Sequence, residues 1–575
     1  MTRCTCRRRS LKAWIFSFLC IGVIGLLVNY VIVERLHAKI GVRELPSVPF
    51  YLSNKHGQQH AASMEAVYKQ GELGNFEPPS EPVGTGPGQG GQPVKIMKTD
   101  LSSVRDYGCD MTVSDMISLD RSIPDTRPRE CKFWHYPTNL PSASVVVVFY
   151  NEGNSTLLRT VHSIINRSPP SLLKEVVLVD DGSTKDHLKK PLESYIRRFK
   201  GLVKLYRNEE RLGLIGARMR GAREATGDVF IVLDSHCECN TNWLPPLLHR
   251  IALNRRTLVQ PTVDVISYND FAYKNIFYKM VKGVFDWGLL YKEMYGSDEE
   301  QAAKWKHNSE PYGTPTHAGG LFAVDRKYFF DIGGYDENLL VWGGENFQLS
   351  FKMWMCGGRM EMVPCSRVGH VYHSGMPYSL NINKKRPTKM SVIKHNYLRV
   401  VEGWMDEYKE YFYIREPDVR HRAHEVNVTD QLELRKKLGC KSFKWYLDNV
   451  AYGILDRFPL PPPNKAWGRI QERNGSQCFV KARTLIIGYC GGAVFRYNTA
   501  GQISNGEYCL AYKEKSQVFM FPKCPDGRSH PWDWNQETGL IRHPELNQCL
   551  TSAPQVFLSD CDKNNLKQQW VMKAA

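Results

Sequence analysis

The chain has 575 residues, which is too long for one small module and leaves room for several domains. Hydrophobic residues make up 42% of it and charged residues 23%, which excludes a wholly disordered chain and a polytopic membrane protein. The formal charge of +17 would suit a phosphate-bearing ligand, but charge alone does not choose among ligands.

A stretch without a charged side chain, residues 13–33, follows a short basic tail. At about 1.5 Å per residue, a helix of this length crosses a hydrocarbon core of about 30 Å. The tail carries basic residues and no acid, which predicts a cytosolic segment at 1–12, a transmembrane signal anchor at 13–33 and a lumenal remainder. A cleaved signal peptide is the alternative, but its apolar region is normally shorter.

Composition divides the rest of the chain. Residues 34–100 are polar and rich in Gly and Pro near their end, which predicts a lumenal stem. A second proline-rich break at 456–466 predicts a linker between a domain over 101–455 and a domain over 467–575.

The central domain opens with an alternation of strand and helix patterns. A β-branched run at 144–152 precedes a helix-period segment at 155–170, and a second apolar run at 175–183 contains Asp180 and Asp181. This order predicts a Rossmann-like α/β fold with ligands at the carboxyl ends of the strands. The alternative for the two acids is that they cap the next helix.

A third apolar run, residues 227–238, contains Asp234 and His236. In extended backbone these two side chains point to the same side, because strand side chains alternate with period two. A carboxylate and an imidazole so placed can hold a divalent cation, and the mixed oxygen and nitrogen set suits manganese. A simple hydrogen-bonded pair is the alternative.

Five motifs in order, FYNE, LVDDGS, LDSHCE, AGGLFAVDR and VWGGENFQLSFKMWMCGG, resemble those of the polypeptide N-acetylgalactosaminyltransferases. These retaining enzymes start mucin-type O-glycosylation on Ser and Thr, and the resemblance covers the chain from about residue 107 to its end. It implies a GT-A catalytic fold, UDP-GalNAc as donor, a Ser- or Thr-containing peptide or mucin as acceptor, and Mn²⁺ as cofactor. Tail, anchor and stem are a common arrangement among Golgi enzymes, so we expect a single-pass type II protein of the Golgi membrane, with no nucleic acid partner.

The resemblance also assigns roles to individual residues. His370 matches the third metal ligand beside Asp234 and His236. The catalytic set is Trp342, Glu345 and Asn346, the donor-binding set is Asp181, Arg211, Asp234, Trp342, His373 and Tyr378, and the acceptor-binding pair is Phe285 and Trp287. Glu345 is expected to position groups, with a double displacement through its carboxylate as the alternative. For Phe285 and Trp287 the alternative is core packing.

Four positions depart from the family pattern without removing a metal ligand, so activity is expected. His373 stands where an arginine is usual and Met376 where a histidine is frequent. Tyr150 replaces a histidine and Gly216 an arginine. Loss of a permanent cation near the diphosphate should weaken donor binding or change its pH dependence.

Cysteine pairing in the central domain follows from the resemblance, which implies Cys109–Cys365 and Cys356–Cys440 and leaves Cys237 and Cys239 free. A zinc site at HCEC would need a second ligand pair that the spacing does not supply.

Beyond the linker, cysteines recur as three pairs: Cys478 with Cys490, Cys509 with Cys524, and Cys549 with Cys561. The three repeats resemble the ricin-type β-trefoil lectin of this family. Sugar-reading repeats there carry Cys-Leu-Asp, but this chain has Val480, Ala511 and Thr551 at the aspartate positions. We therefore expect a folded trefoil that binds GalNAc weakly or not at all.

Two other functions remain open from the residues alone. An inverting galactosyltransferase shares WGGE but normally carries acids after it, where this chain has Asn346 and Phe347. A catalytically weak or inactive relative that only binds peptide is the second, and the intact metal motif opposes it.

Overall fold

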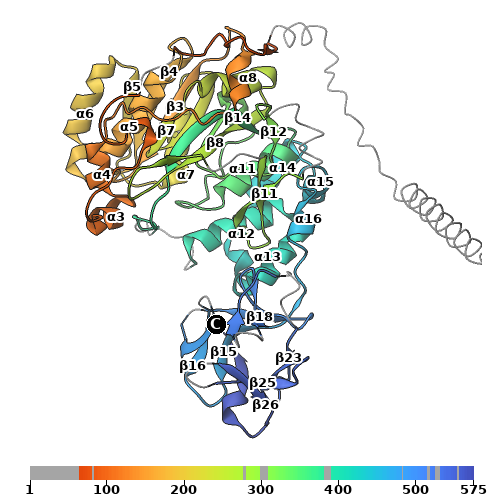
Figure 1. Ribbon diagram of the computed structural model, residues 1–575. Helices are drawn as coiled ribbons and strands as arrows, with labels where there is room; N and C mark the ends of the chain where they lie inside the picture. The colour runs from red at the N-terminus through yellow and green to blue at the C-terminus, as the bar shows by residue number, and fades with distance from the viewer. Residues whose placement is uncertain are drawn as a thin grey trace, which may run out of the picture. The chain divides into compact units, whose positions relative to one another are not determined.

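The computed structural model describes residues 64–79, 83–275, 280–297, 308–380, 390–481, 484–491, 493–513, 518–524, 531–552 and 556–574 (Figure 1). No helix within these ranges is long and apolar enough to cross a membrane. The predicted tail and anchor, residues 1–33, lie outside the described residues.

A mixed sheet forms the centre of the catalytic region, in the strand order β12-β14-β8-β13-β6-β3-β4-β5. The strands β6, β3, β4 and β5 are parallel, while β13 is antiparallel to β6 and β8, and β14 runs parallel to β8. The bounds are β3 Ala143–Phe149, β4 Leu173–Asp180, β5 Val203–Arg207, β6 Val229–Asp234, β7 Cys237–Cys239, β8 Thr257–Ile266, β9 Tyr273–Lys274, β12 Tyr312–Gly313, β13 Phe322–Asp325 and β14 Arg359–Val371.

Helices cover both faces of this sheet (Figure 1). Along β3, Val145 and Val147 pack with α5, α6 and α8, whereas Val146 and Val148 pack with α7 on the other face. A strand buried on both faces reads as a continuous β-branched run, which explains the sequence pattern. The helices here are α3 Leu101–Tyr107, α4 Met111–Met116, α5 Asn154–Asn166, α6 Lys190–Ile196, α7 Leu214–Glu224, α8 Leu244–Leu253, α10 Arg326–Asp331 and α11 Glu345–Met355. The predicted α/β fold is confirmed.

A second helical core follows the sheet. It joins α11 to the hairpin of β10 and β11 and to the later helices through a cluster of buried aromatic and aliphatic side chains. The elements are β10 Val281–Phe285, β11 Tyr291–Tyr295, α12 Val392–Trp404, α13 Lys409–Arg415, α14 Thr429–Lys437, α15 Phe443–Asn449 and α16 Ile454–Arg457.

Part of the segment predicted as a stem packs against the catalytic region. The strand β1 (Val67–Tyr68) pairs with β2 (Trp134–His135). Farther along, the buried guanidinium of Arg127 donates to Glu77 at 2.7 Å. In the later part, the backbone N–H of Val94 donates to the carbonyl of Asp270 at 2.8 Å. The polar composition alone did not indicate that these residues pack on the catalytic region.

The carboxyl-terminal region consists of short antiparallel strands around one aromatic core that includes Phe479, Phe495, Trp532 and Trp570. The strand β15 pairs with β27, so the two ends of the region meet. The bounds are β15 Asn464–Glu472, β16 Gln477–Lys481, β17 Leu485–Tyr489, β18 Phe495–Asn498, β19 Ile503–Asn505, β20 Tyr508–Cys509, β21 Ala511–Lys513, β22 Val518–Met520, β23 Asp533–Trp534, β24 Ile541–His543, β25 Gln548–Thr551, β26 Phe557–Asp560 and β27 Trp570–Lys573.

One predicted disulfide is wrong. Cys365 bonds Cys131, with their Cα atoms 5.3 Å apart, and Cys109 is a buried free thiol. Cys131 lies in a short 3-10 turn beside β14, whereas Cys109 packs with Met111 in a separate apolar cluster. The other expected bonds, Cys356–Cys440, Cys478–Cys490, Cys509–Cys524 and Cys549–Cys561, are present, and Cys237 and Cys239 are free.

Candidate active site

Strand pairing brings the predicted metal ligands together. Asp234 is the last residue of β6, and His236 follows just before β7. The strand β14 pairs with β7 so that His370 lies opposite Cys237, the neighbour of His236. The carboxyl end of β6 therefore meets a histidine that is distant in sequence.

Asp234, His236 and His370 offer one oxygen and two nitrogen atoms that lie within 4.8 Å of one another. Asp234 Oδ2 is 3.4 Å from His370 Nε2, and the buried Nδ1 of His370 has no hydrogen-bond partner among the described residues. A Cβ on Gly320 would lie 2.4 Å from Asp234 Oδ2, so any other residue there would require this carboxylate to move. The donor set and the cradle fit a divalent cation such as manganese.

The charges around this triad favour metal binding. Burial opposes ionisation of Asp234, but His370 and Arg218 together hold the pKa of its carboxyl well below the usual range. Burial lowers the pKa of His370, which keeps its imidazole neutral. An ionised carboxylate and a neutral imidazole are the forms that bind metals.

Arg218 of α7 is a site residue that the motif analysis missed. Its side chain is buried, with one nitrogen 3.1 Å from Asp234 Oδ1 and another 3.5 Å from Glu345 Oε1. One fixed cation thus stands between the metal carboxylate and the carboxylate of WGGEN. The sequence held one indication of this role: Arg218 follows Gly216 by two residues, on the face of α7 that packs toward the sheet.

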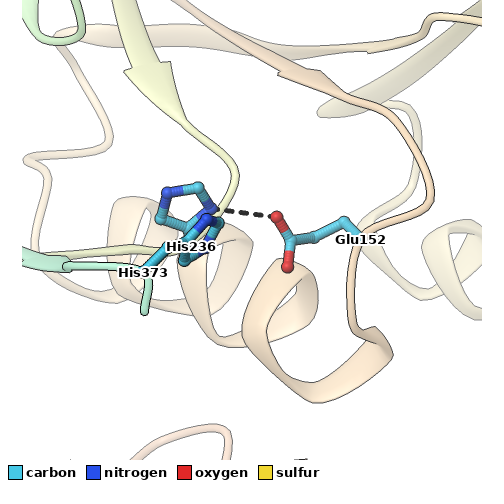
Figure 2. A group of neighbouring side chains, drawn as sticks. All are labelled: Glu152, His236 and His373. Carbon is cyan, nitrogen blue, oxygen red and sulfur yellow. Dashed lines mark hydrogen bonds and ion pairs between the residues drawn. The ribbon is translucent and has the colours of Figure 1, made fainter. Parts of the chain in front are cut away.

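Glu152, the last residue of FYNE, is the second residue that was missed. His236 Nδ1 is 2.9 Å from Glu152 Oε2, as Figure 2 shows, and Ser235 Oγ donates to the same oxygen at 2.7 Å. Burial opposes ionisation of Glu152, but the neighbouring histidines lower its pKa to about 2. Its carboxylate raises the pKa of His236 against the effect of burial. A bond at Nδ1 leaves Nε2 as the free nitrogen of that ring.

The WGGEN segment forms the sharp entry to α11. Gly343 and Gly344 have φ values of 99° and 85°, in the left-handed region that favours glycine. This turn lets the backbone N–H of Gly343 donate to Glu345 Oε2 at 2.8 Å. The side chain of Asn346 donates to the carbonyl of His317 at 3.3 Å.

The predicted donor-site residues Asp181, Arg211 and Tyr378 lie on one wall. The Asp181 carboxylate accepts from the backbone N–H groups of Leu212 and Gly213, each at 2.8 Å, and burial raises its pKa. The guanidinium of Arg211 lies 3.9 Å from the ring centre of Tyr150 and 5.9 Å from that of Tyr378.

Asp180 has a different part, because it accepts from the backbone of Ser183 at 2.8 Å and pairs with Arg207. Asp180 therefore stabilises the turn after β4, which is close to the predicted helix-capping role. Asp181 does not have this role, because its carboxylate accepts from Leu212 and Gly213.

Two cavities meet at the triad. The larger, about 1080 Å³, is lined by all the predicted metal and donor residues and by Glu345. The second, about 820 Å³, is bounded by polar and aromatic side chains that include Arg127, Glu293 and Tyr372. Both cavities include Asp234, Gly320, Trp342 and His370 in their walls.

Phe285 and Trp287, predicted to contact an acceptor, line neither of these cavities. Both are buried, and Phe285 packs against the rings of Phe347, Phe351 and Tyr446. The structure thus favours the core-packing alternative. Phe285 joins β10 to α11, whereas Trp287 packs against Tyr408 and Tyr411 and lines a third cavity of about 340 Å³.

The trefoil positions expected to read sugar carry no carboxylate. Thr551 Oγ1 is 2.7 Å from Ser559 Oγ and 3.0 Å from Gln568 Nε2, so its polar atom is already engaged. Ala511 is buried and Val480 is half-buried, and neither has a polar side-chain atom.

Comparison with known families matches three regions of the chain. Residues 144–329 match Glycosyl transferase family 2, residues 300–374 match the N-terminal domain of galactosyltransferase, and residues 466–570 match the Ricin-type beta-trefoil lectin domain.

Similar proteins cover most of the chain. Drosophila melanogaster N-acetylgalactosaminyltransferase 7 is 46% identical over 525 residues, covering 87% of each chain. Caenorhabditis elegans probable N-acetylgalactosaminyltransferase 7 is 44% identical over 528 residues, covering 88% of this chain and 86% of its own. A crystal structure of GalNAc-T7 with UDP, GalNAc and Mn²⁺ matches with a TM-score of 0.80 and 39% identity, over 89% of this chain and 97% of that one.

Proposed function

Because the chain belongs to the polypeptide N-acetylgalactosaminyltransferase family, we propose that it transfers GalNAc from UDP-GalNAc to Ser or Thr hydroxyls of polypeptides with retention of configuration. The observation that carries this function is the triad of Asp234, His236 and His370 at the junction of two cavities. One cavity can hold a donor and the other an acceptor, with the reacting atoms where they meet.

We assign UDP-GalNAc to the larger cavity. Asp181 is held by backbone N–H groups at its back, which leaves its carboxylate beside the space for a ribose or uracil. Arg211, stacked on Tyr150, presents a permanent cation to the same wall. Trp342 supplies an apolar plane and Tyr378 a hydroxyl.

Asp234, His236 and His370 would hold the manganese ion. When bound, this cation neutralises charge that develops on the departing diphosphate. Arg218 keeps Asp234 ionised, and Glu152 fixes the orientation of the His236 ring.

Glu345 acts in this scheme as a positioning residue. One of its oxygens accepts from the backbone of Gly343, and the other faces Arg218. A carboxylate with both oxygens engaged is oriented and charge-stabilised, which reduces its nucleophilicity. This supports attack by the acceptor hydroxyl on the face from which UDP leaves, and opposes double displacement through Glu345.

The second cavity is our candidate for the peptide acceptor. Its walls combine apolar surface with charged groups of both signs, among them Arg127, Glu130 and Glu293. Such a surface can take a backbone through hydrogen bonds and side chains through apolar contact. Phe285 would support this wall through Tyr291, its partner in the β10–β11 hairpin.

We also propose the membrane arrangement from the sequence pattern: a tail at 1–12, an anchor at 13–33, and a catalytic domain at 101–455 and lectin domain at 467–575 in the Golgi lumen. Part of the stem, from residue 64, would pack on the catalytic domain. The test is protease protection of sealed microsomes carrying a tag at each end of the chain.

The decisive assay incubates the full-length chain with UDP-GalNAc, Mn²⁺ and either naked or GalNAc-bearing mucin peptides. We expect transfer by the wild type and a loss of at least about a thousandfold for Asp234→Ala, because the metal carboxylate is removed. Mass spectrometry of the peptides measures the product.

The matched control is Asp228→Ala, which removes an exposed carboxylate of the turn before β6. Its rate should stay within about twofold of wild type. Equal silence of wild type and Asp234→Ala with metal bound would refute the transferase function. Transfer from UDP-galactose in preference to UDP-GalNAc would instead support the galactosyltransferase alternative.

A further inference from the structure

A second set of metal-binding side chains adjoins the first. Glu152, His236 and His373 offer a carboxylate oxygen and two imidazole nitrogens that lie within 4.8 Å of one another. Figure 2 shows the His236 and His373 rings side by side with the Glu152 carboxylate facing them. The centres of the two rings are 4.2 Å apart.

His373 has no other partner for its ring within the described part of the chain. Its Nε2 is buried without a hydrogen bond, which costs free energy unless a ligand or ion meets it. Gly108 explains why the ring lies inward, because a Cβ there would be 2.5 Å from His373 Cγ. The glycine that ends α3 thus makes room for an imidazole beside Glu152.

Like the first set, this second set offers one carboxylate and two imidazoles as metal ligands. Two histidines and one glutamate form the three-ligand set that zinc uses in open, four-coordinate sites. Zinc binds imidazole more strongly than manganese does, as the order of divalent metal affinities requires. An arginine at position 373 could supply no ligand, so this set depends on the imidazole of His373.

We propose that Glu152, His236 and His373 form a second metal site that binds Zn²⁺ and shares His236 with the site of Asp234 and His370. His236 has two nitrogens on opposite sides of its ring, and Nδ1 is the one that faces Glu152. The zinc ion takes the place of the proton between His236 Nδ1 and Glu152, and that proton passes to solvent. The opposite nitrogen remains for the first cation.

The test loads the full-length chain with Mn²⁺ and UDP, adds Zn²⁺ in small excess, removes unbound metal and counts both metals by mass spectrometry. We expect about one zinc per chain beyond the retained manganese in the wild type. His373→Arg, which replaces the imidazole by a permanent cation, and His373→Gln should each bind no added zinc. Thermal unfolding of each variant checks that it is folded.

His162→Arg is the matched control, because His162 also has a carboxylate partner, Asp120 at 2.7 Å, but belongs to neither ligand set. It should bind zinc as the wild type does. Displacement of manganese by zinc, or unchanged zinc binding by folded His373→Arg, would overturn the proposal. Because the readout is metal content, a failure here is distinguishable from a failure of GalNAc transfer.

Discussion

In the trefoil, the amide nitrogen of buried Gln568 lies within 3.0 Å of Thr551 Oγ1, Ser559 Oγ and the carbonyl of Asp560. In the catalytic domain, His370 Nδ1 and His373 Nε2 are buried and have no such partner among the described residues. Buried polar atoms normally find partners within the protein, so those that do not are candidates for binding something else. The contrast gives Gln568 a structural role and makes the two histidine nitrogens, which line the larger catalytic cavity, candidates for contact with a ligand or ion.

The largest expected effect on catalysis comes from removing the guanidinium of Arg218 from the catalytic site. Arg218→Met keeps length but leaves Asp234 and Glu345 without their shared guanidinium. We expect kcat for GalNAc transfer to fall about a thousandfold, about 4 kcal/mol, because two buried carboxylates lose their counter-charge. Steady-state kinetics on a mucin peptide measure it.

Arg223→Met on the same helix is the control, since its ion pair with Glu337 is exposed. It should leave kcat within about twofold. A full rate for Arg218→Met would mean that the buried pair is not part of the machinery.

The disulfides offer a second comparison of the two regions. Cys131–Cys365 closes a loop with a sequence separation of 234, while Cys549–Cys561 closes one of 12. Loop-closure entropy predicts a loss of about 5 kcal/mol for Cys131→Ala with Cys365→Ala, against about 3 kcal/mol for the trefoil pair. Urea unfolding, followed separately for each domain, measures both losses.

Cys109→Ala serves as the control for the corrected pairing. It removes a buried thiol and no covalent bond, so its cost should stay at about 1 kcal/mol. A larger loss for Cys109→Ala than for Cys131→Ala would restore the pairing of Cys109 with Cys365.

Removing the side-chain amide of Gln568 tests the structural role proposed for this residue in the trefoil. Gln568→Ala should destabilise this domain by about 1–3 kcal/mol, because it leaves the hydroxyls of Thr551 and Ser559 short of a partner. Gln569→Ala, which loses one bond to the Lys563 carbonyl, should cost less. Urea unfolding of the trefoil measures the loss of stability in each variant. Equal losses for Gln568→Ala and Gln569→Ala would contradict a structural role that belongs to Gln568 in particular.

The last prediction concerns pH. Glu175 accepts from Ser144 and Thr226, each at 2.7 Å, and burial is outweighed by these bonds and Lys204, so its pKa falls to about 2. A lowered pKa in the folded state gives stability that is present above the ordinary value of 4.5 and disappears as pH falls toward about 2.

Glu175→Gln should therefore lose some stability at pH 7 and progressively less as pH falls from 4.5 to 2. The cost of Gln568→Ala should not vary in this way, because an amide does not titrate. Urea midpoints at pH 7 and pH 3 test both, and an equal cost of Glu175→Gln at the two values would contradict the assignment.

Much of the site could be predicted from the sequence because its ligands stand in contiguous motifs. Asp234 and His236 share one strand end, and the match of His370 required only the family pattern. Arg218 could not be found this way, since its role depends on which face of α7 meets the sheet. The same limit explains the error at Cys109, because two cysteines far from Cys365 in sequence were available and only the packing decides.

Trp287 and Phe285 show a different limit of sequence-based prediction. An aromatic pair suits a binding surface and a protein core equally well by its chemistry, and only the folded structure shows that both side chains are buried. Glu152 and His373 were visible in the sequence, but their closeness to His236 is a property of the folded loops.

Gly320 carries a consequence for classifying relatives of this enzyme. The methyl group of an alanine there would occupy space 2.4 Å from Asp234 Oδ2 and push the carboxylate away from the two histidines. A protein could therefore keep every metal ligand and still lose catalysis through one added carbon atom. Screens for inactive members, including the assessment of inherited variants, should score this glycine as strictly as the ligands themselves.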